Sequence, residues 1–575
     1  MTMSQSTSPN PSLFSLLRTY RLPILGMLAL AMSAGALALV LPRIVQGGID
    51  AFEAGTYDPG AFALRFLLVV AATFVLAYGA TASQTLLSER VARDLRASIS
   101  EKLSRQSHAY VQHRTAAYLL TVITSDVDAV KQFVSMVVVT MTTAVFMIVG
   151  AGVMLLSIDR PLGFAVLAVI PVIVIAFTTI FRRIGPLFLK VQKTLDRLNK
   201  AINESILGAA LVRILRSQPA EKEKFAAVNA DSKALGMSIL RLFGSLIPVV
   251  TFLAGVMTLI ILALGGTFVV RGTMTLGGFV AFNSYAGLLI FPIMMIGFMS
   301  NLIGRAAASY GRITGVTSAT EPEPDGGVKA ALRGDVELRD VSLLYGERTV
   351  LRDVSFTAPA GTSTAIIGPT AAGKTQLLYL LTGLLPPNTG EVLYDGRPLR
   401  DYDGEDLHAQ IGFVFQDGVV FNMSIRDNIA FSGVTDADAI DKAVRTAELQ
   451  DFVDAHPDGL DAMVSERGTS LSGGQKQRLM LARALASSPR VLLLDDFTAR
   501  VDPATEARIL ASIAANYPRT TVISVTQKVT SARAADRIVL LMEGEVLAQG
   551  THDELMASSP EYVQIDASQR SVDHL

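Results

Sequence analysis

Residues 368–375 read Gly368-Pro369-Thr370-Ala371-Ala372-Gly373-Lys374-Thr375 and have the form GxxxxGK[ST]. A short run typical of a strand, Ser363–Ile367, precedes this loop, and a segment typical of a helix begins at about Lys374. Glycines let the backbone wrap closely around phosphates, and the amides of a helix N-terminus favour an anion. The pattern predicts a nucleotide site in which Lys374 contacts the β- and γ-phosphates and Thr375 binds Mg²⁺. Gln376, which follows them, is also expected to bind the nucleotide.

A carboxylate that could complete this site is predicted at Asp495. The stretch Val491-Leu492-Leu493-Leu494-Asp495 reads as an apolar strand that ends in an acid. An acid at the end of a buried strand suits a Mg²⁺ site beside a phosphate loop. Other β-branched runs, such as Thr364–Ile367 and Thr521–Val525, alternate with helical segments. This alternation predicts an α/β domain over residues 331–575.

The chain before residue 321 has a different character. Of all 575 residues 50% are hydrophobic, the mean hydropathy is +0.42 and only 18% are charged. Six spans are apolar and long enough to cross a bilayer, which takes about 20 helical residues. These spans are 22–45, 61–83, 134–158, 162–181, 242–270 and 276–302. The sequence predicts an all-α six-helix transmembrane domain over residues 1–320, and a linker over 321–330 that contains Pro and Gly.

Charges next to the spans predict their orientation. Arg18 and Arg21 precede the first span, whereas the loop after it carries acids and neither Lys nor Arg. The connections after the second and fourth spans are basic, which places both, with the N-terminus, in the cytoplasm. Both connections are long and helical in pattern, over Leu87–Tyr110 and Leu187–Leu207. We expect membrane helices with long cytoplasmic extensions that turn near residues 113–117 and 207–210, although an ordinary solvated hairpin would give the same pattern.

Composition excludes several function classes. The net charge of −1 gives no electrostatic case for nucleic-acid binding. The absence of cysteine excludes disulfides and thiolate metal sites. Residues 1–10 are polar and uncharged, so we expect the first apolar span to be a retained membrane helix rather than a signal peptide.

A second motif, Leu471-Ser472-Gly473-Gly474-Gln475, follows the phosphate loop. With the loop, the carboxylate strand and the six spans, it makes the chain resemble the ABC transporter family over nearly its full length. The likeness is to exporter-type half-transporters, which carry six membrane helices and one nucleotide-binding domain. It implies that ATP and Mg²⁺ bind here, and that Ser472, Gly473, Gly474 and Gln475 cap the ATP bound to an opposing subunit.

The resemblance implies further roles. Tyr345 matches the aromatic residue that stacks on adenine, although a strand aromatic in the core would fit as well. Gln416 matches a glutamine that senses Mg²⁺ and contacts the membrane domain, and Asp502 matches an aspartate of the loop after the carboxylate strand. Glu466-Arg467-Gly468 resembles a loop that faces the cytoplasmic helix tips.

Two catalytic positions depart from the family pattern. The family usually has Glu after Asp495, as the general base that activates water, whereas this chain has the shorter Asp496. The family normally has His where this chain has Gln527, which can donate a hydrogen bond but cannot carry a positive charge. The stretch Ala499-Arg500-Val501-Asp502 also departs from the pattern. The chain therefore resembles the degenerate subunit of heterodimeric multidrug exporters; a homodimer with two slow sites is the alternative.

The expected function is ATP-driven export of hydrophobic or amphipathic molecules, such as drugs or lipids, from the inner membrane of a cell, with a second half-transporter as partner. An importer of the same architecture, resembling siderophore importers, and a nucleotide-gated regulatory subunit are alternatives. Polar, aromatic and methionine residues of the sixth span could contact a substrate or only pack between helices. These residues are Asn283, Ser284, Tyr285, Phe291, Met294, Met295, Phe298 and Met299, with Pro292 as a possible kink.

Overall fold

The computed structural model describes residues 13–320, 327–345, 348–433, 436–465, 468, 470–497 and 501–573. These residues form two compact units. The helical unit holds residues up to 105 and 114–320, and the α/β unit holds residues 106–113 together with the chain from 321 onward.

Among the described residues, the helical unit contains six helices that are long and apolar enough to cross a membrane, as predicted. Two are single helices near the N-terminus, α2 (Arg21–Glu53) and α3 (Pro59–Ser104). The third and fourth each consist of several consecutive helical segments. The third spans Ala116–Ile158 and ends with α7 (Val138–Ile158). The fourth spans Arg160–Leu207 and is mostly α9 (Val169–Leu207). The fifth contains α11 (Gln218–Ile260) and continues to Val270, and the sixth is α13 (Leu276–Thr317). Each predicted apolar span lies inside one of these helices.

Local sequence explains where these helices begin. Asp58 caps α3, since its Oδ1 accepts hydrogen bonds from the amides of Gly60 and Ala61 at 2.9 and 3.1 Å, and Pro59 occupies the first turn. Thr275 caps α13 through a 3.0 Å hydrogen bond from the amide of Gly278. Neither cap belongs to the apolar pattern that identifies the spans.

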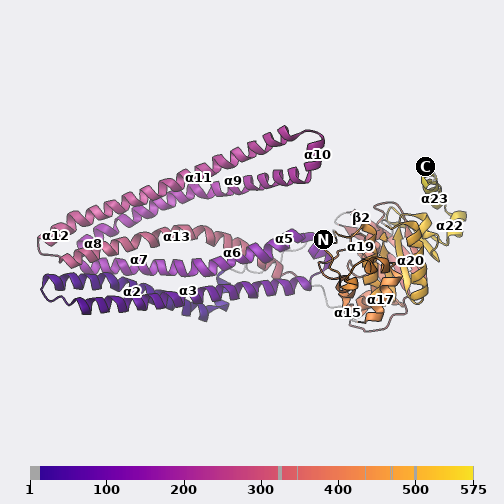
Figure 1. The fold of residues 1–575 in the computed structure, drawn as a ribbon, viewed down its shortest axis with the longest axis horizontal. Helices are drawn as coiled ribbons and strands as arrows, with labels where there is room; N and C mark the ends of the chain where they lie inside the picture. The colour runs from indigo at the N-terminus through magenta and orange to yellow at the C-terminus, as the bar shows by residue number, and fades with distance from the viewer. Residues whose placement is uncertain are drawn as a thin grey trace. The chain divides into compact units, whose positions relative to one another are not determined.

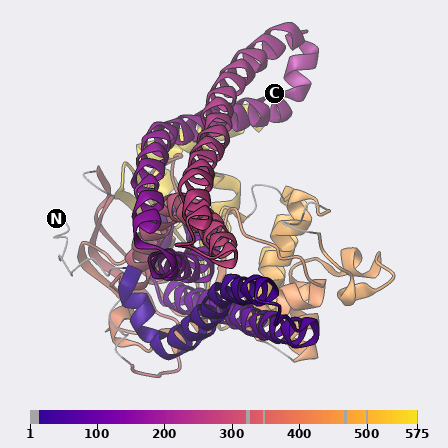
Figure 2. The same cartoon turned by 90° about the vertical axis from the view of Figure 1, so that its left-hand side faces the viewer.

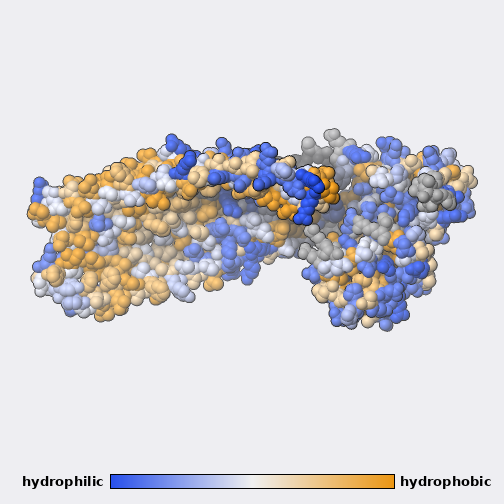
Figure 3. All heavy atoms as spheres, turned by 45° about the horizontal axis from the view of Figure 1, so that its top comes forward, coloured by the Kyte–Doolittle hydropathy of each residue, from blue (hydrophilic) through white to orange (hydrophobic). Residues whose placement is uncertain are grey.

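The helices extend well beyond the apolar spans and then turn, as expected. Along the helical unit, Figure 3 shows hydrophobic residues concentrated toward the end that carries the α2–α3 turn and hydrophilic residues toward the other end. The second turn follows Leu207, where the short α10 (Ala209–Ile214) joins α9 to α11. The first expected turn, near residues 113–117, falls at Thr115 between α4 (His108–Arg114) and α5 (Ala116–Thr121). The helix before it is shorter than predicted, because α3 ends at Ser104 rather than near Tyr110.

Toward α10, the hairpin of α9 and α11 diverges from the other long helices (Figure 1), whereas its other half packs against α13. Figures 1 and 2 both show α2, α3, α7 and α13 side by side, with this hairpin projecting away from them toward α10. The hairpin joins the rest at the opposite end, through α8 (Arg160–Leu167) and α12 (Gly266–Val270).

The α/β unit is built on a six-stranded sheet in the order β10-β9-β3-β8-β7-β6. Only β10 (Glu545–Gly550) is antiparallel to its neighbour, β9 (Arg537–Met542). The parallel strands that follow β9 across the sheet are β3 (Ser363–Ile367), β8 (Thr521–Thr526) and β7 (Val491–Asp495), with β6 (Ile411–Val414) at the edge. Parallel strands buried on both faces read as apolar runs, as β7 does.

The described residues of the α/β unit form three hydrophobic cores. The first packs against a four-stranded antiparallel sheet and α14 (Lys374–Leu381), and the second lies among α17 (Ala437–Thr446), α19 (Gly473–Ala486) and α20 (Pro503–Asn516). The third joins β3 and β9 to α22 (His552–Ser558) and α23 (Pro560–Asp573). The four-stranded sheet has the order β2-β1-β4-β5. Its strands are β1 (Val336–Tyr345), β2 (Arg348–Ala358), β4 (Thr389–Tyr394) and β5 (Arg397–Pro398).

Candidate functional site

The sheet brings the expected site residues to one edge. Strands β3, β8, β7 and β6 are consecutive neighbours and run parallel. The phosphate loop follows β3, Gln527 follows β8, Asp495 and Asp496 come at the end of β7, and Gln416 follows β6. Ligands of open α/β folds bind outside the carboxyl ends of such strands. Residues far apart in the sequence therefore converge here because of strand order.

The phosphate loop is tight, and two of its glycines explain why. Gly373 precedes α14 with φ +97°, and a Cβ at this position would lie 2.7 Å from Cδ2 of Leu351. A Cβ at Gly368 would lie 2.0 Å from the carbonyl oxygen of Leu541 in β9. Larger residues would displace the neighbouring strands. The intervening residues Pro369, Thr370, Ala371 and Ala372 complete the turn, with Ala371 also at positive φ.

Lys374 lies inside this loop. Its Nζ donates to the carbonyl oxygens of Gly368 and Pro369, both at 2.8 Å, and the residue is buried. Burial lowers the pKa of Lys374, whereas the charges of Asp496 and Asp495 oppose that shift. A buried ammonium at the N-terminus of α14 favours binding of an anion. The next residues of the helix, Thr375 and Gln376, add amides to its first turn.

Asp495 has the environment of a cation ligand. Its Oδ1 accepts a 3.2 Å hydrogen bond from the Thr375 hydroxyl, while its Oδ2 is buried and has no hydrogen-bond partner among the described residues. Burial raises the pKa of Asp495 to about 6. Mg²⁺ is commonly held by one or two carboxylates together with substrate phosphates. Thr375 and Asp495 fit that role, and no cluster of three His, Cys, Asp or Glu in the described ranges offers another metal site.

Asp496 and Gln416 face each other across this edge of the sheet. Nε2 of Gln416 donates to Oδ2 of Asp496 at 3.5 Å. Burial raises the pKa of Asp496, and the charges of Lys374 and Lys528 oppose the shift. Asp496 has φ +45°, and its amide donates to the carbonyl of Val525 at 3.0 Å. This bond ties the strained turn after β7 to β8.

Gln527 lies over the phosphate loop. Its Oε1 accepts a 3.4 Å hydrogen bond from the Thr370 hydroxyl. Its carbonyl oxygen accepts a 2.7 Å hydrogen bond from Nε2 of Gln569, which belongs to α23 (Pro560–Asp573). Sequence reasoning missed Gln569, since no motif marks it and α23 lies near the end of the chain. Gln527 therefore contacts the phosphate loop itself, while Gln416 and Asp496 pair with each other at the same edge of the sheet.

Tyr345 is not a core residue. It ends β1 and is 61% exposed, which excludes the alternative of a buried strand aromatic. Its hydroxyl donates to Oε1 of Gln112 at 3.5 Å, within the α/β unit to which residues 106–113 belong. An exposed ring at the end of a strand can stack on a planar ligand. Gly346, the next residue, lies outside the described residues.

Ser472 to Gln475 form the start of α19. The Ser472 hydroxyl accepts from the Gln475 amide at 3.2 Å, and Oε1 of Gln475 accepts from the Ser472 amide at 2.8 Å, which is a capping box. The first turn of α19 also contains Gly473 and Gly474, so small residues leave its amides accessible. The helix packs on the second core, away from the core of the phosphate loop.

The remaining expected loop residues are partly described. Asp502 caps α20, because its Oδ1 accepts from the Thr505 amide at 2.9 Å, and these hydrogen bonds hold the pKa of Asp502 below its usual value. Ala499 and Arg500 of the same loop lie outside the described residues, as do Glu466 and Arg467. Gly468, which follows them, has φ +65°.

The candidate substrate residues of α13 lie in different environments, some packed between helices and others exposed. Tyr285 is fully buried, and its hydroxyl donates to the Leu39 carbonyl at 2.6 Å, so it joins helices rather than facing a ligand. Phe298 contacts Phe181 edge-on at 5.3 Å and stacks on Phe243 at 6.2 Å. Phe291 is 67% exposed. These residues therefore do not form one common surface.

Comparisons with known proteins find ABC transporter relatives for both halves of the chain. A family model for the ABC transporter transmembrane region matches residues 24–293, and one for the ABC transporter matches residues 351–499. The uncharacterized ABC transporter ATP-binding protein YfiB of Bacillus subtilis is 33% identical over 542 residues, which cover 92% of this chain and 93% of that protein. The ATP-dependent lipid A-core flippase of Ralstonia nicotianae is 30% identical over 574 residues, 97% of either chain.

A solved structure shares the fold. A bacterial Atm1-family ABC exporter with ATP bound matches with a TM-score of 0.80 at 24% identity, over 96% of this chain and 99% of that chain.

Proposed function

The chain belongs to the ABC transporter family, with the architecture of an exporter-type half-transporter, and from this we propose that it is one subunit of a heterodimeric ATP-driven exporter. The complex moves hydrophobic or amphipathic molecules out of the cell by alternating access. The chain lies in the inner membrane, with its N-terminus and α/β unit in the cytoplasm. The name of one relative, a lipid A-core flippase, supports an amphipathic substrate.

The observation that carries the proposal is the combination of retained binding residues with two altered catalytic residues. Lys374, Thr375 and Asp495 have the geometry to hold MgATP. Asp496 and Gln527 stand where the family uses a longer acid and a histidine. The chain's own site then binds ATP but hydrolyses it slowly, while Ser472–Gln475 complete the partner's site.

Reach and charge explain the slow site. A general base acts within about 2.6–3.2 Å of its water, and Asp496 is one methylene shorter than Glu. Loss of that reach lowers the rate, since a displacement of about 1 Å can cost 100-fold. Gln527 keeps a hydrogen-bond donor but cannot become a cation, so it stabilises the charge on a transferring phosphoryl group less than histidine would.

A second subunit is also supported by the tip of the α9–α11 hairpin. The tip lies at the hydrophilic end of the helical unit, yet large apolar side chains are exposed there, with Leu207 79% and Ile214 78% exposed. A bilayer does not cover this end, so a protein surface is the natural cover. The exposed set is Ile206, Leu207, Leu211, Ile214 and Leu215. We infer that it docks on the partner's nucleotide-binding domain.

The test measures ATPase activity of the purified chain alone and co-expressed with a second half-transporter that has the consensus catalytic Glu and His. In the complex, Asp496→Asn is compared with the same substitution at the partner's matching carboxylate. We expect the chain alone to be nearly inactive, and only the partner's substitution to abolish turnover. An active dimer of this chain that loses activity with Asp496→Asn would show a homodimer with working sites. Uptake into inside-out vesicles would establish the direction of transport.

A further inference from the structure

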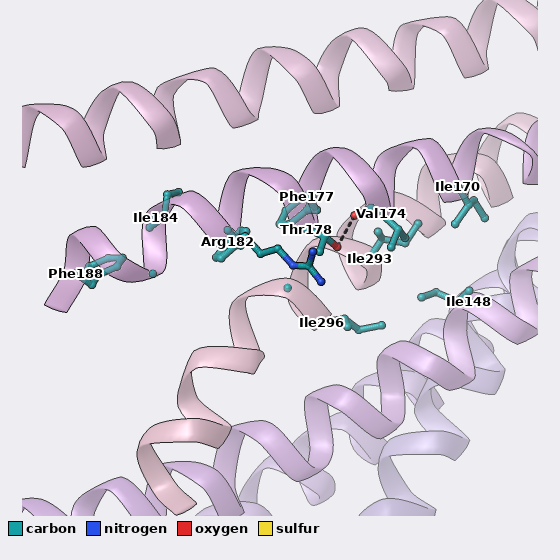
Figure 4. A pocket seen from close by; sticks show the side chains of 13 residues that line it. Ile148, Ile170, Val174, Phe177, Thr178, Arg182, Ile184, Phe188, Ile293 and Ile296 are labelled. Atoms are coloured by element: carbon teal, nitrogen blue, oxygen red, sulfur yellow. Dashed lines mark hydrogen bonds between the residues drawn. The ribbon is translucent and has the colours of Figure 1, made fainter. Parts of the chain in front are cut away.

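A cavity of about 610 Å³ lies between α7, α9 and α13 within the helical unit. Its wall is apolar over most of its surface, with aromatic rings from Phe177, Phe181 and Phe188 of α9 and aliphatic side chains such as Ile293 and Ile296 of α13. Figure 4 shows side chains from these helices directed toward the same space. Pockets of about 300–1,000 Å³ hold drug-sized ligands, so the cavity is large enough for one.

Two polar side chains line this cavity, Thr178 and Arg182. The Thr178 hydroxyl donates to the Val174 carbonyl at 2.8 Å, so its proton is engaged within the helix and is not offered to a ligand. Arg182 has no ion pair or hydrogen bond to any residue in the described part of the chain. A guanidinium carries five N–H donors and no acceptor. The cavity therefore combines an apolar wall with one unmatched cation.

Membrane orientation alone does not explain why Arg182 lines the cavity. Arg182 and Arg183 follow the same apolar span, and either would serve as the basic residue at its cytoplasmic end. Only Arg182 lines the cavity. Arg182 and Arg183 are both exposed, and Arg183 has no part in the wall, which makes it a matched control of equal charge at nearly equal depth.

The apolar wall is built by ring packing. Phe177 stacks on Phe181 with ring centroids 5.3 Å apart, and Phe181 meets Phe298 of α13 edge-on at the same distance. Phe177 approaches α13 closely because residue 297 is glycine; a Cβ there would lie 2.7 Å from the ring. Gly185 lies one turn after Phe181 on the same face of α9, and a Cβ there would meet nothing within 4 Å, so Gly185 borders open space.

We propose that this cavity binds a membrane-derived amphiphile with an anionic head group, which pairs with Arg182 while its hydrocarbon chain lies against Phe177, Phe181 and Phe188. The inference rests on the proposed export function and narrows its substrate class to anionic single-chain amphiphiles. A guanidinium binds carboxylate or phosphate in a bidentate manner. A neutral or zwitterionic amphiphile would fill the same volume but would gain less from Arg182.

The test measures binding of radiolabelled lysophosphatidic acid to the full complex in phosphatidylcholine nanodiscs, without nucleotide. We expect saturable binding that Arg182→Gln weakens about 10- to 100-fold, the effect of losing a charge-assisted hydrogen bond. Arg183→Gln should leave the affinity almost unchanged, and Arg182→Lys should restore part of it. Lysophosphatidylcholine should bind more weakly and respond little to Arg182→Gln.

A second variant tests the cavity itself. Gly185→Leu should fill the open space and weaken binding of both amphiphiles, with the elution volume and unfolding temperature of the complex unchanged. Equal effects of Arg182→Gln and Arg183→Gln on the affinity, or no effect of Gly185→Leu, would overturn the proposal. Absence of saturable binding would also overturn it, and would be the result if helices of the partner covered the cavity. Competition by inorganic phosphate alone would show a simple ion site instead. Because no ATP is turned over, binding can stand even if the ATPase comparison rejects the heterodimer.

Discussion

The side-chain amide of Gln416 lies 3.5 Å from the carboxylate of Asp496, and so joins the residues that follow β6 and β7. The same carboxylate would have to reach a water molecule beside the phosphate loop to act as a base. The turn at φ +45° and the hydrogen bond from its amide to the carbonyl of Val525 hold the backbone of Asp496 in this position. A longer side chain would extend the reach of the carboxylate.

We therefore expect Asp496→Glu combined with Gln527→His to raise ATP hydrolysis at this chain's own site about 10-fold or more, since a positioned acid or base contributes about 100- to 10,000-fold. The measurement uses the complex whose partner site is inactivated, so that only this site contributes. Asp496→Asn with Gln527→His is the control that supplies the histidine without a base. A double variant no faster than this control would show that reach and charge do not limit the site.

Binding of MgATP should weaken as pH falls through about 6. The pKa of Asp495 is raised to about 6, chiefly by burial, so below that pH the group becomes neutral and loses its affinity for Mg²⁺. Nucleotide affinity measured between pH 7.5 and 5.5, with and without Mg²⁺, should converge at the acid end. Asp495→Asn should remove this pH dependence, and an unchanged profile in that variant would assign the titration to another group.

The same raised pKa has a consequence for stability without nucleotide. A carboxyl whose folded pKa exceeds its ordinary value of 3.8 destabilises the fold above that value, and fully so above about pH 6. Asp495→Asn should therefore raise the unfolding temperature of the nucleotide-free protein at pH 7, with little change at pH 4. The sign reverses if Mg²⁺ and ATP are present, because the carboxylate is then a ligand.

Gly368→Ala should abolish ATP binding. A Cβ at residue 368 would lie 2.0 Å from the Leu541 carbonyl oxygen, so the loop or β9 must shift. Gly396→Ala is the control, since Gly396 has φ +79° but nothing within 4 Å of its Cβ. The control carries the cost of left-handed backbone, about 1–2 kcal/mol, and no clash. Binding of a fluorescent ATP analogue should fall only with Gly368→Ala; equal losses would point to general destabilisation.

The sequence predicted the six spans and the strands β3 and β7 because long apolar runs and a loop of fixed pattern have few alternative structures. Strand order was not readable from the sequence, and the encounter of Thr370 with Gln527 depends on it. Gln569 was missed because the contact uses the Gln527 carbonyl, which any residue provides. Tyr285 could equally face a ligand or a neighbouring helix, and only packing against Leu39 decides.

The helical pattern also conceals short π-helical turns. One of them, Val122–Asp126, ends at a buried carboxylate, and hydrophobic periodicity does not reveal a change of hydrogen-bond register within a helix. Asp126 accepts from Nη2 and Nε of Arg312 at 2.6 and 2.8 Å and from the Ser309 hydroxyl at 2.9 Å. This bidentate pair links the third long helix to α13.

Asp126→Ala should lower the stability of the helical unit by about 1–3 kcal/mol, the cost of leaving charged donors without their partner. The cost stays below that of a fully buried pair because the Arg312 side chain is 44% exposed and water can replace the carboxylate in part. The control is Asp128→Ala, which removes a pair with Arg96 at 2.8 Å whose side chains are 53% and 44% exposed. Exposed pairs contribute about 0–1 kcal/mol. Thermal unfolding in detergent should therefore show a clear loss only for Asp126→Ala. Adding Arg312→Ala to the Asp126→Ala variant should lower the stability little further. Equal losses of stability in Asp126→Ala and Asp128→Ala would show that burial of Asp126 does not strengthen its pair with Arg312.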